Sequence, residues 1–357
     1  MNLTKKALLT LCLAFLFLFT ACSGQEAPPA PAPEPPPATD TPAETPDEPE
    51  EEVVTLVLST VATEASTYAG QRLMEIAYRE SGGTILMNHF PDNVLGNDRV
   101  VVESAIFGDI DIVMSSTSPL VDLFPDFLLF DGHFLFQDNA HAHAIMGGPI
   151  GRAVLDGMEV HGLKGFAFWE QGFRNLTNNI TPARSPEDVQ GLVVRTMENP
   201  IHIAAWNAFG ANPTPMSFAE VFTAMQQGTI DGQENPLAII DQNRFYEVQN
   251  YIVLTLHCYV PHVIAMNLDR WNSLSENQQR ALEIAFAEAT EIQWARAAAN
   301  EAAIYERLQE QDVEIIHLTP EERALFEAAI AASPVLDMIR SGMNNPHLLD
   351  EVLASMN

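Results

Sequence analysis

Hydrophobic and polar positions between residues 53 and 169 follow two alternating patterns, one typical of strands and one of helices. Short apolar runs predict strands at Val53–Ser59, Thr84–Asn88, Ile110–Met114 and Gly165–Trp169. Apolar residues at helical spacing predict helices at Glu64–Gly82 and Asn97–Phe107, and one or two helices within Ala140–Val160. This strand–helix–strand–helix–strand order predicts a parallel sheet in an α/β protein.

The same alternation continues in a second unit. Helix start signals predict helices after Ser185 and at Pro200–Phe209, and a capping box at Ser217–Glu220 opens a helix over Phe218–Gln227. Strands are expected at Leu192–Thr196, Ile230–Gln233 and within Val253–Met266. Glu276–Gln311 contains no helix breaker, so we expect one long helix that lies across more than one domain.

The first 52 residues have a different pattern. Lys5 and Lys6 precede the apolar run Ala7–Phe19, which has the length of a signal peptide rather than a membrane span. The following stretch, ending in Cys22, resembles the lipobox of bacterial lipoproteins, which implies a signal peptide over 1–21 and a lipid on Cys22. Secretion with cleavage nearby is the alternative. Residues 22–52 would form a linker, because Gln25–Glu52 contains ten prolines and nine acids.

Charge and cysteine content exclude several classes of protein. The 357-residue chain has 48 acidic and 17 basic residues, a net charge of -31, so we expect no nucleic-acid partner. Beyond the N-terminal segment Cys258 is the only cysteine, so no internal disulfide is expected there. Its apolar surroundings predict a buried side chain rather than a nucleophile.

The sequence gives little evidence for a catalytic site or a metal site. The sequence contains no G-x-S-x-G, P-loop, G-x-G-x-x-G after a strand, or H-E-x-x-H motif. His141 and His143 would point about 200° apart on a helix, so they do not share an ion. Together with His133 they are expected to be solvent-facing or capping residues. We therefore expect neither a metal nor a cofactor.

Three longer motifs carry a specific resemblance. They are Trp169–Asn178, containing Gly-Phe-Arg; Gly191–Glu220, with an arginine at a strand end; and Ile230–Pro236, containing Asp-Gly-Gln-Glu-Asn-Pro. Together they resemble the solute-binding subunits of tripartite ATP-independent periplasmic (TRAP) transporters of the dicarboxylate-binding type. The resemblance extends from Val53 to the C-terminus.

The resemblance implies an α/β, two-lobed periplasmic-binding-protein-like fold. Each lobe would contain a mixed sheet flanked by helices, and the long helix would span both. Lobe one would comprise 53–171 with about 261–300, and lobe two 172–260 with about 301–357. The chain would cross between the lobes near Gly172 and Val260.

The resemblance also implies a ligand site. Arg195 would clamp a ligand carboxylate, which suits a guanidinium because it offers paired donors and stays charged. Arg174 and Asn235 would contact the ligand, and Asp98 would accept from its hydroxyls or hold a neighbouring arginine. Thr60 and Ser116 match variable contacts of lobe one, and Trp169 and Phe173 are candidates for an apolar wall.

The sequence therefore predicts an extracytoplasmic, lipid-anchored receptor that performs no chemistry. It would capture a small organic acid, such as a C4-dicarboxylate or a sugar acid, and deliver it to the small and large membrane subunits of a TRAP transporter. Two alternatives remain open at this point. One is a secreted α/β enzyme acting on a carboxylate, and the other is a binding protein of an ATP-driven transporter.

Overall fold

A first mixed sheet is built mainly from the N-terminal half of the chain. The computed structural model describes residues 51–61 and 63–356, so the predicted signal peptide and lipidation site at Cys22 lie outside the described residues. In this sheet β1 (Val54–Ser59) pairs in parallel with β2 (Ile85–Phe90) and β3 (Ile112–Ser116). β10 (His262–Asn267) pairs antiparallel with β3 and with β4 (Leu163–Trp169), which gives the order β2-β1-β3-β10-β4. The predicted parallel arrangement of the first three strands is confirmed.

The first two helices of this half begin at residues whose side chains cap the helix N-terminus. The Thr63 side chain accepts from the backbone N–H of Ser66, and the Asn97 side chain accepts from that of Val100. Gly108 ends the second helix with φ +85°, a conformation that glycine adopts without a Cβ penalty. The helices are α1 (Glu64–Glu80), α2 (Asp98–Phe107), α3 (Asn139–Met146) and α4 (Pro149–Asp156).

A second mixed sheet has the order β11-β9-β5-β8-β6-β7. Its strands are β5 (Arg174–Asn178), β6 (Val193–Thr196), β7 (Asn212–Pro215), β8 (Gly232–Pro236), β9 (Tyr251–Leu254) and β11 (Glu314–His317). β5 runs antiparallel to both of its neighbours, while β6 is parallel to β7 and β8. Gly232 is required where β8 passes β5, because a Cβ there would collide with the carbonyl oxygen of Thr177.

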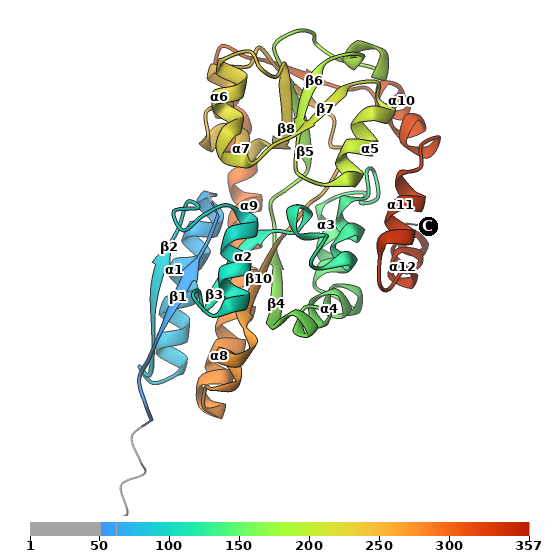
Figure 1. The fold of residues 1–357 in the computed structure, drawn as a ribbon. Helices are drawn as coiled ribbons and strands as arrows, with labels where there is room; N and C mark the ends of the chain where they lie inside the picture. The colour runs from blue at the N-terminus through green and yellow to red at the C-terminus, as the bar shows by residue number, and fades with distance from the viewer. Residues whose placement is uncertain (1–50, 62, 357) are drawn as a thin grey trace, which may run out of the picture. The chain divides into compact units, whose positions relative to one another are not determined.

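The chain passes between the two sheets at 170–173 and again at 255–261. These two segments are joined by an antiparallel β-bridge between Phe173 and Tyr259. Gly172 has φ +97° at the first passage. One helix, α9 (Glu276–Gln309), contacts elements of both halves, including α1, β4 and α7 (Leu237–Gln242). Figure 1 shows α9 extending from the half that contains β1 and β2 towards α7 in the other half. The fold class predicted from the sequence, including the long helix, is confirmed.

The C-terminal helices pack beside both halves. α11 (Val335–Gly342) contacts α5 (Pro200–Ala208) and also a 3-10 helix at Pro125–Asp131. The Asn345 backbone N–H and side-chain amide both donate to the Asp126 carboxylate, each at 2.8 Å. The remaining helices are α5 (Pro200–Ala208), α6 (Val221–Gln226), α8 (Leu268–Asn272), α10 (Pro320–Ala331), α11 (Val335–Gly342) and α12 (His347–Ser355).

Three predicted elements differ from the structure. The helix after Ser185 is a single 3-10 turn, Pro186–Val189, because Gly191 follows at once with φ +79°. The capping box at Ser217 does not form, and 218–227 divides into a 3-10 turn and α6. The predicted strand character of Val253–Met266 divides between β9 and β10, which belong to different sheets.

Candidate functional site

One pocket lies where strands of the two sheets end. The carboxyl ends of β1, β3, β6 and β8 meet there, together with the start of α2, and open α/β sheets place ligand sites at such strand ends. The cavity has a volume of about 190 Å³. Its lining residues are Val61, Asn93, Asn97, Asp98, Arg99, Ser116, Pro119, Asp122, Gln171, Arg174, Arg195, Met197, Glu198, Ser217, Phe218, Asn235, Ile239 and His262.

Arg195 is a buried cation in this pocket. β6 carries it to the pocket at its third position, and its side chain is 3% exposed. Its Nε and one terminal nitrogen donate to the carbonyl oxygen of Met216, at 3.0 and 2.7 Å. Among the described residues no carboxylate lies within 4.0 Å of it. Burial lowers the pKa of Arg195 to about 10, so the guanidinium remains charged at neutral pH.

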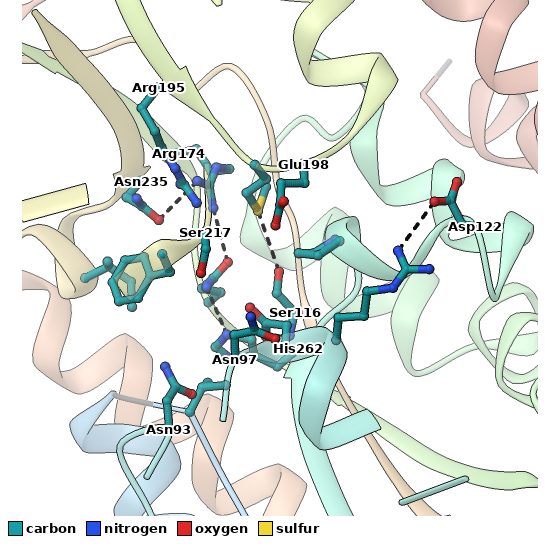
Figure 2. Close-up of a pocket in the computed structure, with 18 residues that line it drawn as sticks. Asn93, Asn97, Ser116, Asp122, Arg174, Arg195, Glu198, Ser217, Asn235 and His262 are labelled. Atoms are coloured by element: carbon teal, nitrogen blue, oxygen red, sulfur yellow. Dashed lines mark hydrogen bonds and ion pairs between the residues drawn. The ribbon is translucent and has the colours of Figure 1, made fainter. Parts of the chain in front are cut away.

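Arg174 is also buried, but its charge is neutralised. Its Nε donates to one Glu234 carboxylate oxygen at 2.5 Å, and a terminal nitrogen donates to the other at 2.9 Å. The same nitrogen donates to the Asn235 side-chain oxygen at 3.0 Å. Burial alone would raise the pKa of Glu234, but the charge of Arg174 holds this pKa well below its usual range. Figure 2 shows Arg174 and Asn235 beside Arg195 at one wall of the pocket.

Asp98 also lines the pocket, at the first position of α2. Its carboxylate accepts from the Ser115 hydroxyl at 2.7 Å and from the Ser116 backbone N–H at 2.9 Å. Burial raises the pKa of Asp98, while these hydrogen bonds lower it, and the net shift is upward. A carboxylate fixed in this way presents acceptor sites to a hydroxylated ligand.

Comparison with known proteins places this arrangement in a family. The family model for bacterial extracellular solute-binding proteins, family 7, matches residues 58–338. The 2,3-diketo-L-gulonate-binding periplasmic protein of Escherichia coli K12 is 36% identical over 279 residues, which is 78% of this chain and 84% of that protein. The chain belongs to the family 7 solute-binding proteins. The resemblance found in the motifs is thereby confirmed.

Two solved structures of solute-binding proteins have the same fold. A TRAP periplasmic solute-binding protein from Polaromonas, bound to D-erythronate, has a TM-score of 0.79 and 32% identity, covering 84% of this chain and 98% of its own. A sugar acid binding protein from Advenella mimigardefordensis, in complex with galactonate, has a TM-score of 0.81 and 29% identity, covering 85% and 98%. Among residues 51–61 and 63–356, no helix is long and apolar enough to cross a bilayer.

Five of the eight ligand contacts predicted for this family 7 protein line the pocket: Arg195, Arg174, Asn235, Asp98 and Ser116. They come from both sheets and from segments up to 137 positions apart, between Asp98 and Asn235. Four of these positions stand at or next to strand ends, which explains why the fold collects them.

The other three predicted contacts do not line it. Trp169 is fully buried in the core, and its Nε1–H donates to the Thr290 hydroxyl at 3.0 Å, so its prediction as a pocket wall is corrected. The Thr60 hydroxyl pairs with the His89 ring at 2.8 Å, and Phe173 packs edge-on against Tyr259. The apolar part of the pocket comes instead from Val61, Pro119, Met197, Phe218 and Ile239.

Sequence reasoning missed several lining residues of this solute-binding protein. Gln171 bridges the Arg174 guanidinium, at 3.4 Å, and the His262 ring, at 2.9 Å. Burial first, and the charge of Arg174 second, lower the pKa of His262 to about 3, so the ring is neutral. Ser217 lines the pocket instead of capping a helix, and Glu198 is another lining residue. Gln171 lies within the Trp169–Asn178 motif, so its position in that motif could have identified it as a pocket residue.

The expected roles of the histidines need one correction. His133 is neither solvent-facing nor capping, because it is buried with its ring 5.2 Å from that of His202. His143 stacks on Trp294 and pairs with Glu170, whereas His141 pairs with Ser355. The described residues contain no group of three or more His, Cys, Asp and Glu side chains that could hold a metal.

Cys258 is buried, as predicted, and burial raises the pKa of its thiol well above the usual range.

Proposed function

We propose that this family 7 protein captures a small organic acid anion at the pocket and holds its carboxylate on Arg195. The observation that carries the proposal is the buried guanidinium of Arg195, which has no carboxylate partner among the described residues. Desolvating an unpaired cation is costly, and a ligand carboxylate offsets that cost through paired, charge-assisted hydrogen bonds. Met216 takes only one edge of the guanidinium, which leaves further donors for the ligand.

The relatives support this class of ligand. Their names describe binding of 2,3-diketo-L-gulonate, D-erythronate and galactonate, each of which is an organic acid anion. The hydrogen-bonding residues around Arg195 suit such a ligand, because amide, hydroxyl and carboxylate groups read hydroxyls as well as carboxylates.

We further propose that the two halves act as lobes which close on the ligand. Lobe one is 53–171 with about 261–300, and lobe two is 172–260 with about 301–357. Pocket residues come from strands of both sheets, so a bound anion contacts both halves and stabilises the closed form. α11 contacts both α5 and the 3-10 helix Pro125–Asp131, so the C-terminal segment also connects the two halves.

The membrane partners and the anchor belong to the same proposal. The receptor delivers its ligand to the small and large membrane subunits of a TRAP transporter, and a lipid on Cys22 holds it at the outer face of a membrane. Buried CH₂ groups of acyl chains anchor a protein without basic residues, which suits so acidic a chain. Cys22→Ala should release the protein from membranes into the soluble fraction. A variant that still partitions with membranes into detergent would exclude this anchor.

A thermal-shift screen against organic acids tests the central proposal. A ligand that binds only the folded state raises stability by RT ln(1 + [L]/Kd), so true ligands raise the Tm with concentration. Chromatography after long incubation should then recover the acid unchanged, which separates a receptor from an enzyme. Conversion of the acid would support the enzyme alternative, and a screen without any stabilising acid would contradict the proposed ligand class.

A further inference from the structure

The charged side chains around the pocket leave one cation available to a ligand. Three arginines line the pocket, and two of them already have carboxylate partners. Arg174 pairs with Glu234, and Arg99 pairs with Glu103 at 3.1 Å and Asp122 at 3.5 Å. Arg195 alone among these three has no such partner within the described residues. A ligand therefore finds one ready position for a carboxylate.

Glu198 lies close to that position and has the opposite charge. It follows β6 by two residues, lines the pocket and is exposed. In the described part of the chain its carboxylate has no hydrogen bond or ion pair, and its charge contributes to the electrostatic environment of Arg195. Figure 2 shows Glu198 and Arg195 entering the pocket from the same side, with Ser116 across from them.

A second carboxylate on the ligand would be placed poorly here. It would have to lose water without an unpaired arginine to receive it, and it would meet the negative charges of Glu198 and Asp98. Arg174 and Arg99 already have carboxylate partners that neutralise their charge, so each attracts a second carboxylate less strongly than Arg195 attracts the first. A hydroxyl group, by contrast, donates to these carboxylates and also bonds to neutral polar groups such as Asn97 and Ser217.

We propose that Glu198 is a specificity-determining residue, which accepts hydrogen bonds from the hydroxyls of the bound acid and disfavours a second carboxylate. This inference rests on the proposed function and narrows it: the ligand is a hydroxylated monocarboxylate rather than a dicarboxylate. Glu198 would both attract a ligand hydroxyl and repel a second ligand carboxylate. The repulsion matters more for specificity, because burying an unmatched charge costs more free energy than losing one hydrogen bond.

Calorimetric titration with matched acids tests the inference. D-Erythronate is compared with meso-tartrate, and D-galactonate with galactarate, since each pair differs only by oxidation of the terminal CH₂OH to a carboxylate. At least one monocarboxylate should bind ten times more tightly than its dicarboxylate partner. Glu198→Gln keeps the shape but removes the charge, and should reduce that ratio at least fivefold. Glu306→Gln, at an exposed position of α9 outside the pocket, is the matched control and should leave the ratio within twofold.

Two results would overturn the assignment while leaving the proposed function intact. One is that at least one of the four acids binds, but neither monocarboxylate binds the unmodified protein ten times more tightly than its dicarboxylate partner. The other is a Glu198→Gln ratio equal to that of Glu306→Gln. If none of the four acids binds and the wider screen also finds no stabilising acid, the proposed function is contradicted. The role inferred for Glu198 is then contradicted as well.

Discussion

Arg174 and Glu234 form an ion pair that is fully buried, with both side chains 0% exposed, between the neighbouring strands β5 and β8. A guanidinium whose Nε and terminal nitrogen both meet one carboxylate is a strong, directional pair. The pair neutralises Arg174, so the two buried arginines of the pocket have different roles. Arg174 holds β8 and the amide of Asn235 in place, and Arg195 is left for an anion.

Breaking this pair should destabilise the fold. Glu234→Gln leaves Arg174 charged and buried, and removal of one partner of a buried pair costs about 3–5 kcal/mol. Urea unfolding of the ligand-free protein measures the loss. The control is Glu306→Gln, the same substitution at an exposed position, which should change the unfolding free energy by less than about 0.5 kcal/mol. Equal stability of the two variants would show that Arg174 and Glu234 are not paired in solution.

Arg195→Lys should weaken ligand binding strongly. Lysine keeps the charge but lacks the planar fork, and its more strongly hydrated ammonium resists burial. We expect a loss of about 2–4 kcal/mol, a factor of roughly 30–1,000 in Kd, as for other disrupted buried charge pairs. Calorimetry with the acid identified by screening measures the change, with Arg280→Lys at an exposed position of α9 as the control. Binding by folded Arg195→Lys within threefold of the unmodified protein would remove Arg195 from the site.

Stability should fall as the pH is lowered, in part because of His262. Burial lowers the pKa of His262 to about 3, whereas an unfolded histidine titrates near 6.5. Between these values the unfolded chain binds a proton that the folded chain does not, so the free energy of unfolding decreases with decreasing pH. The expected contribution is about 2 kcal/mol between pH 6.5 and 5.

The histidine contribution is separable by substitution. Unfolding of His262→Gln in urea at pH 7, 6 and 5 should show a shallower dependence on pH, because glutamine does not titrate. His347→Gln, at an exposed position, serves as the control. Parallel curves for the unmodified protein and His262→Gln would contradict the lowered pKa.

Ligand binding should be indifferent to chelators. The described residues offer no cluster that could hold a metal, and His141 and His143 point to different partners. Titrations before and after dialysis against EDTA should give the same Kd. A loss of binding that zinc restores would show that a metal takes part after all.

Local patterns were enough to predict most of the elements and the family. Apolar periodicity predicted the strand–helix alternation, and the helices predicted at Glu64–Gly82 and Asn97–Phe107 form as α1 and α2. These features are visible in sequence because they depend on residues three or four positions apart. β5 was missed, since Arg174–Asn178 is mostly polar and reads as a loop. It is buried because its polar side chains find partners on strands far away in sequence.

The sequence by itself determined that Arg195 lies near the end of an apolar strand in a chain with few cations, and that the chain's motifs belong to this family. Only the tertiary structure decided which side chains share the pocket. It placed Trp169 in the core and Glu198 beside Arg195, and it paired Arg174 with a glutamate 60 positions away. The reason is physical: whether a buried charge is neutralised depends on contacts across strands, and strand pairing is not encoded in local spacing.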